Sequence, residues 1–78
     1  MNRLMQVSNH VDIAIDADVV RYCDKKQVVI TMMRNPRLKD NCYAVHDVGF
    51  EDGCMIFWGH YDLNFEEAVD SFNTKSIR

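Results

Sequence analysis

The sequence predicts a small α+β domain in which an antiparallel sheet of three to four strands carries a C-terminal helix packed on one face. Three observations support this prediction: a β-rich apolar run over residues 27–33, an Asp52-Gly53 pair between two apolar segments, and a capped amphipathic pattern that begins at Asn64. We expect one domain over residues 1–78, with its elements in the order β, short α, β, β, β, α.

The first expected element is a strand over residues 10–16. Val11, Ile13 and Ile15 alternate there with polar or small residues. A period of two with one apolar face is typical of a half-buried strand. The acidic side of this strand would then face water.

Residues 17–26 are compatible with two structures. Three apolar residues share one face at helical spacing, which favours a short helix capped by a preceding aspartate: Val19, Val20 and Cys23. Adjacent valines lower helix propensity, however, and residues 24–26 have the composition of a hairpin turn. We predict the short helix and keep the turn as the alternative.

An interior strand is predicted over residues 27–33, because both of its faces are apolar. Pro36 lacks a backbone donor and ends this strand, and the loop continues to about Asn41.

The strongest local pattern is a hairpin formed by residues 42–50 and 54–61. Its Asp52-Gly53 pair predicts a two-residue type I′ turn, in which both residues have positive φ. This register pairs Val48 with Phe57 and His46 with Gly59. The expected core face carries Phe50, Met55, Val48, Phe57, Ala44 and Tyr61.

The opposite face of the hairpin is too apolar to be simply solvated, and it is the predicted protein interface: Tyr43, Val45, Asp47, Ile56, Trp58 and His60. Tryptophan and tyrosine are frequent in interface hot spots, and large exposed apolar patches usually mark contacts. The alternative is that Trp58 belongs to the core, because a one-residue slip in register would exchange the two faces.

A helix is predicted after Asn64, which has Glu67 three residues later as in a capping box. One apolar stripe at i, i+3, i+4 and i+7 would pack on the core face: Phe65, Ala68, Val69 and Phe72. Lys75 is expected to face away from the sheet.

Charge and composition exclude several classes of protein. The 78 residues include 12 acidic and 9 basic ones, a net charge of −3. We expect no nucleic-acid binding on this balance, since the densest basic stretch is only a loop with Arg34, Arg37 and Lys39. No apolar run approaches a membrane span and the N-terminus lacks a secretion signal, so we expect a cytoplasmic protein without membrane attachment.

Chemistry-bearing residues form no motif that specifies a cofactor or a metal. Cys23, Cys42 and Cys54 lack a CxxC pair, which argues against a disulfide framework or a structural zinc site. The Asp16-Ala17-Asp18 segment is only a weak divalent-ion pattern. We therefore expect no cofactor, no metal and no catalytic residue.

The predicted function is a non-catalytic protein–protein interaction module that binds another protein or a second copy of itself. By size and charge only, it is comparable to phage or mobile-element accessory proteins that inhibit a host protein, such as anti-CRISPR proteins. The alternative hypothesis is a small metal- or ligand-dependent enzyme or sensor that uses His46, His60, Asp62 and Cys54.

Overall fold

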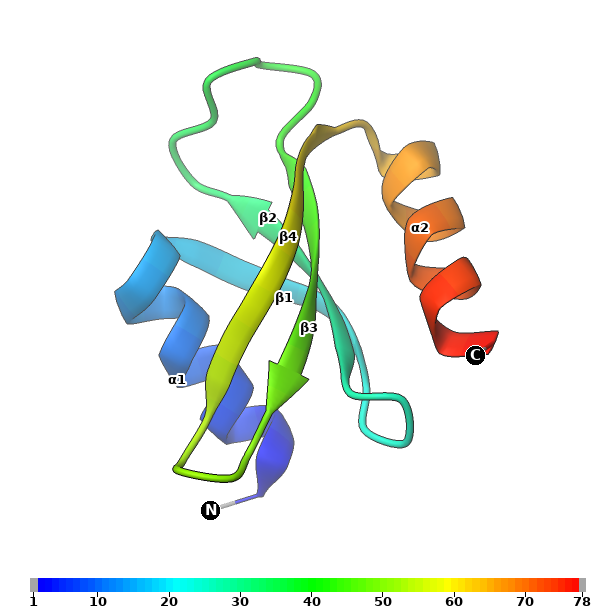
Figure 1. Cartoon of the computed structure of the whole chain (residues 1–78). Helices are drawn as coiled ribbons and strands as arrows, with labels where there is room; N and C mark the ends of the chain where they lie inside the picture. The colour runs from blue at the N-terminus through cyan, green and yellow to red at the C-terminus, as the bar shows by residue number, and fades with distance from the viewer. Residues whose placement is uncertain (1, 78) are drawn as a thin grey trace.

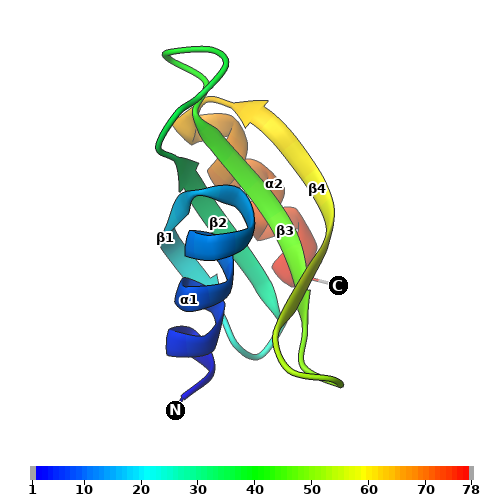
Figure 2. The same cartoon turned by 90° about the vertical axis from the view of Figure 1, so that its left-hand side faces the viewer.

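The computed structural model describes the backbone of residues 2–77 and the side chains of residues 2–75. Two helices and four strands follow in the order α1 (Arg3–Ile15), β1 (Ala17–Cys23), β2 (Val28–Met33), β3 (Tyr43–Gly49), β4 (Met55–Leu63) and α2 (Phe65–Ile77). The strands form an antiparallel sheet in the order β1-β2-β3-β4, so β1 and β4 are its edges. The sheet lies between α1 on one face and α2 on the other (Figure 1, Figure 2).

The predicted α+β class is confirmed, but the predicted order of elements is wrong at the N-terminus. Residues 10–16 are the end of α1 and not a strand. The buried residues of α1 are Val7 and Val11, four positions apart, and Ile15 continues this row, whereas Ile13 is 85% exposed. A short run of alternating apolar residues fits both periods, and packing against the sheet selects the helical one.

The segment after α1 is a strand rather than the predicted short helix. β1 pairs with β2 from Ala17 opposite Met33 to Cys23 opposite Val28. The alternative prediction of a turn at residues 24–26 is confirmed, and Gln27 closes that turn with a φ of 55°. Two β-branched valines suit a strand that packs under α1 better than they suit a helix.

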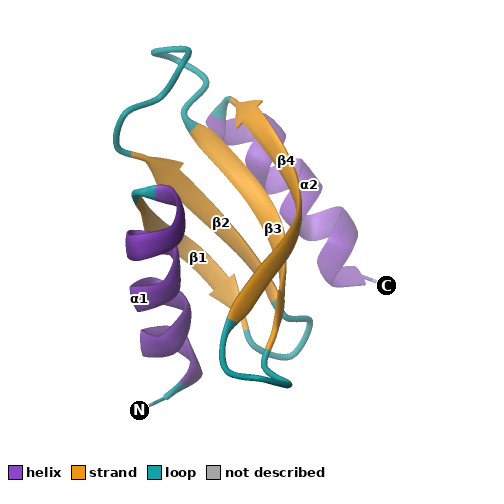
Figure 3. Cartoon of the chain, turned by 60° about the vertical axis from the view of Figure 1, so that its left-hand side comes forward, coloured by secondary structure: helices purple, strands orange, loops and turns teal. Residues whose placement is uncertain are grey.

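The interior strand is confirmed as β2, whose first four residues, 28–31, are all buried. Both of its faces are covered because α1 and α2 lie on opposite sides of the sheet (Figure 3). Val29 packs with the α1 core, and Val28 and Ile30 pack with the α2 core. This arrangement explains the apolar residues at successive positions.

The β3–β4 hairpin is confirmed, but its register differs from the prediction near the turn. Val48 lies opposite Ile56 instead of Phe57, while His46 lies opposite Gly59 as predicted. Gly53 has a φ of 84° and Asp52 is not among the residues with positive φ, so the turn is not type I′. Five residues, 50–54, separate the two strands.

The predicted capping box of α2 is confirmed. The Asn64 side chain accepts from the Glu67 N–H at 2.8 Å, and the Glu67 carboxylate accepts from the Asn64 N–H at 2.9 Å. The helix buries Ala68 and Phe72 against β2 and β3. α2 therefore covers the face of the sheet that carries Val45, which we had predicted to be open. α1 covers the opposite face, on which we had expected α2 to pack.

Candidate protein interface

Among the described residues, the element with the most exposed large apolar side chains is the edge strand β4. Four of its large side chains are about half exposed: Met55 at 55%, Phe57 at 52%, Trp58 at 52% and Tyr61 at 48%. Only the last residue of β4, Leu63, is buried. Since β4 is an edge, its outward backbone groups also lack a strand partner within the sheet.

A bulge at Trp58 determines how the aromatic residues of β4 are presented. Phe57 lies opposite Asp47 and Gly59 lies opposite His46, so Trp58 is an extra residue, with a φ of 49°. The bulge allows Phe57 and Trp58 to lie on the α2 side of the sheet together, although they are consecutive. A strictly alternating strand would place them on opposite faces.

The Trp58 ring covers the ammonium group of Lys75, whose Nζ lies 3.5 Å from the ring centroid. Lys75 Nζ also lies 3.4 Å from the Asp47 carboxylate, and both charged side chains are largely buried. The prediction that Lys75 faces away from the sheet is therefore wrong. The long lysine side chain reaches from the last turn of α2 to the sheet and forms a contact between α2, β3 and β4.

On the opposite face of β4, the Tyr61 ring covers His46 at a centroid distance of 5.1 Å. His46 is 1% exposed, and its Nε2 has no hydrogen-bond partner, nor does Oγ1 of buried Thr31. Burial lowers the pKa of His46, while a hydrogen bond with the Trp58 backbone opposes that shift. The imidazole is therefore neutral in the folded protein at neutral pH.

Gly59 makes room for the Tyr61 ring. A Cβ at position 59 would lie 2.4 Å from Tyr61 Cε2. We expect Gly59→Ala to push the ring off His46 and to lower the free energy of unfolding by about 1–3 kcal/mol. Chemical denaturation measures the loss, and Tyr61→Ala in the same background should relieve the clash. Losses that simply add in the double variant would show that this ring contact is not the cause.

The six predicted interface residues do not form one surface. Trp58 and His60 are exposed and neighbouring, with ring centroids 6.1 Å apart. The other four are covered to different degrees: Val45 is buried under α2, Tyr43 packs edge-on against Phe65, Asp47 contacts Lys75, and Ile56 packs with the α1 core. Val45, Tyr43 and Asp47 are covered because α2 packs on the face that we expected to be open. Ile56 is covered because it lies opposite Val48 and shares the α1 face.

A groove of about 570 Å³ runs between β4 and α2. Trp58 and His60 line it from β4, and Glu67, Asp70 and Lys75 line it from α2. It lies next to the exposed edge, so a segment that pairs with β4 would place side chains at its mouth. Sequence reasoning identified Trp58 and His60 but expected Lys75 to face away, because the composition of the groove wall depends on which face α2 covers.

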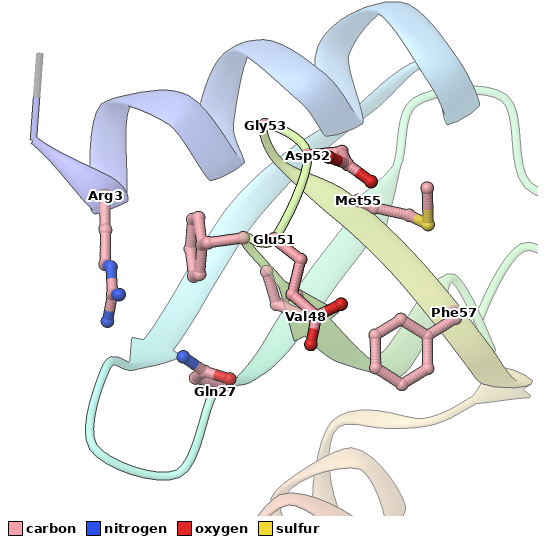
Figure 4. Close-up of a pocket in the computed structure, with 10 residues that line it drawn as sticks. Arg3, Gln27, Val48, Glu51, Asp52, Gly53, Met55 and Phe57 are labelled. Atoms are coloured by element: carbon pink, nitrogen blue, oxygen red, sulfur yellow. The ribbon is translucent and has the colours of Figure 1, made fainter.

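A second hollow, of about 560 Å³, lies beside the β3–β4 loop at the other end of β4. Figure 4 shows Arg3 of α1 on one side and Met55 and Phe57 of β4 on the other, with the Glu51 carboxylate between them. The Arg3 guanidinium lies 4.6 Å from the centroid of the Phe50 ring. Among the described residues, its lining contains no nucleophile next to a base.

The residues of the alternative enzyme hypothesis are not brought together. His46 is buried beneath Tyr61 on the α1 side, whereas His60 lies on the α2 side, so the sheet separates the two histidines. Asp62 accepts from Arg37 at 2.7 Å. Burial raises the pKa of the Cys54 thiol, and all three cysteines are free. Among the described residues, no group of three potential ligands could hold a metal ion.

Arg34 occupies the position between the aspartates of the weak divalent-ion pattern. Its guanidinium lies 2.9 Å from Asp16, 2.8 Å from Asp18 and 2.6 Å from Asp12. The hydrogen bond from Arg34 holds the pKa of the Asp18 carboxyl below its ordinary value. The basic loop is therefore largely neutralised by the protein's own carboxylates, since Arg37 pairs with Asp62.

No protein-family model, curated protein or solved structure matches this chain. Within residues 2–77, neither helix has the length and apolar character needed to cross a bilayer.

Proposed function

We propose that the protein is a non-catalytic protein-binding module that uses the exposed edge of β4. The observation that carries this proposal is the half-exposed row Met55, Phe57, Trp58 and Tyr61 on a strand with an unpaired edge. Edge strands of this kind pair readily with a further strand, and aromatic residues supply much of the binding energy in protein interfaces.

The two edges of the sheet differ in the features that discourage pairing. β1 carries Arg21 next to an irregularity in its ladder, in addition to Asp18, which is paired with Arg34. β4 also has bulges, but it contains no lysine or proline, and its one carboxylate, Asp62, is already paired with Arg37. Charges and prolines are the usual protection of an edge, so β4 is the better partner strand.

The inhibitor role predicted from size and charge is a special case of this proposal, in which the bound protein is a host enzyme. A second copy of the chain is another candidate partner for the same edge. Both cases require access to β4, and neither requires a catalytic residue.

A library of displayed random peptides, panned against the folded domain, tests the proposal. We expect the selected peptides to shift the backbone amide resonances of β4 more than those of β1. Phe57→Lys should weaken their binding by about tenfold or more, because it places a charge at the centre of the interface.

Ile13→Lys is the matched control, since Ile13 is an exposed apolar residue on α1, outside β4. This variant should bind the selected peptides as tightly as the parent protein. Peptides that map to α1 or β1, or that bind equally well to the Phe57→Lys variant, would contradict the proposal.

A further inference from the structure

We propose that the partner of β4 is an extended basic segment, which adds to the sheet as a fifth strand and places a lysine or arginine in the groove between β4 and α2. This inference rests on the proposed function, because it specifies the ligand of the same edge. It is carried by three features that meet at this groove: an unpaired strand edge, a wall of carboxylates and an aromatic ring that contacts an ammonium group.

The strand edge determines where the side chains of such a segment would lie. Side chains of an added strand alternate between the two faces of the sheet. Every second one would lie on the α2 side, at the groove that Trp58 and His60 line. The intervening ones would lie on the α1 side, beside Tyr61 and Ile56. The site therefore favours an alternating pattern rather than a helix.

The charge of the groove specifies what the α2-side residues should be. Glu67 and Asp70 contribute carboxylates, and Lys75 is the only cation that lines the groove among the described residues. Lys75 is already in contact with Asp47 beneath it, so the pair has no net charge. Two negative charges remain at the wall of the groove, which complement a basic side chain and repel an acidic one.

The contacts of Lys75 show that this part of the groove already accommodates a cation. Its ammonium group lies between the Trp58 ring, at 3.5 Å from the centroid, and the Asp47 carboxylate, at 3.4 Å. Aromatic faces and carboxylates together stabilise lysine and arginine side chains that lose part of their hydration. A basic residue of the partner would pair in the same way with the Asp70 carboxylate and with the exposed part of the Trp58 ring.

The α1 side of β4 has a different character. Tyr61 and Ile56 present apolar surface there, and the buried groups behind Tyr61 are the neutral His46 and Thr31. Apolar β-branched residues of the segment fit this side. The complete ligand is thus an extended segment in which apolar residues alternate with polar ones, at least one of them basic.

Two synthetic peptides test this inference directly. Each has nine residues, the length of β4. Threonine and valine alternate from a first threonine to a last threonine, and either arginine or glutamate replaces the central threonine. The chain contains one tryptophan, Trp58, so its fluorescence reports binding next to the groove. We expect the arginine peptide to bind about fivefold to tenfold more tightly, with a preference that decreases as salt is added.

Charge reversal in the protein provides the matched comparison. Asp70→Lys should reverse the preference toward the glutamate peptide, because it replaces a carboxylate of the groove wall. Glu66→Lys makes the same change on an exposed residue of α2 that does not line the groove, and it should keep the preference for arginine.

The outcomes separate this inference from the proposed function. Equal binding of both peptides, or an unchanged preference in the Asp70→Lys variant, would overturn the basic-segment inference and leave binding at the β4 edge intact. Absence of binding by both peptides would overturn pairing at β4 itself, and with it the inference. A preference that also reverses in Glu66→Lys would show that long-range charge, and not the groove, selects the peptide.

Discussion

Replacing Phe72 with alanine is expected to lower the free energy of unfolding by about 3–5 kcal/mol. Phe72 is 6% exposed and packs in the cluster of Val28, Ile30 and Val45, so its removal leaves a cavity between α2 and the sheet. A domain of this size has a total stability of only about 4–12 kcal/mol. Much of the population should therefore be unfolded or close to unfolding in this variant.

Urea denaturation, followed by the fluorescence of Trp58, measures this loss. Phe65→Ala is the matched control, because Phe65 lies on the same helix but is about half exposed and contacts mainly Tyr43. Its removal should cost about 1 kcal/mol. If both variants lost the same stability, the packing of α2 through Phe72 would be wrong.

The second large effect is an acid-induced loss of stability that originates at His46. Its pKa is lowered in the folded state by burial, whereas in the unfolded chain it has its ordinary value of 6.5. Below pH 6.5 the unfolded chain therefore binds a proton that the folded protein does not. Stability is complete above this pH and is lost as the pH falls toward the lower folded-state pKa.

The physical reason is that burial disfavours the charged ring of His46 more than the Trp58 backbone hydrogen bond and the nearby Asp47 carboxylate favour it. Tyr61 covers the ring, and Nε2 has no acceptor to which a proton could be donated. A buried cation with an N–H that finds no acceptor is unfavourable. Acid should therefore open the contact between Tyr61 and His46 and loosen the middle of β4.

Unfolding free energies measured between pH 8 and pH 5 test this expectation. His46→Leu should flatten the pH dependence in the range below 6.5, while His60→Leu should retain it, because His60 is exposed on the other face. If the His46→Leu variant lost as much unfolding free energy in acid as the parent protein, other groups would be responsible for the pH dependence.

The sequence was sufficient where short-range chemistry specifies structure. The Asn64 and Glu67 pattern predicted the start of α2, and the apolar residues 27–33 predicted a strand covered on both sides. The β-turn composition of residues 24–26 also proved correct as an alternative. These patterns depend on neighbours within a few residues, so they do not require knowledge of the tertiary structure.

The candidate site depended on features that no local pattern specifies. A bulge at Trp58 changed the face of Phe57, and a five-residue turn shifted the register between Val48 and Ile56. The unpredicted helix α1 then occupied the face of Val48 and Ile56, which left α2 for the face of Val45. Only Trp58 and His60 of the predicted interface remained exposed, since they lie on the edge strand.

The ion pairs of Arg34 with Asp12, Asp16 and Asp18 make the attachment of α1 to the sheet differ from that of α2. Asp12 and Asp16 at the end of α1 form exposed ionic contacts with Arg34, the residue that follows β2, and the side chains that α1 buries are the small Val7 and Val11. α2 is attached by the larger Phe72 and by the Lys75–Asp47 ion pair, which is largely buried and therefore screened less by salt. Dissolved salt screens the first attachment and leaves the apolar one nearly unaffected. Ionic strength thus acts selectively on the N-terminal layer of this domain.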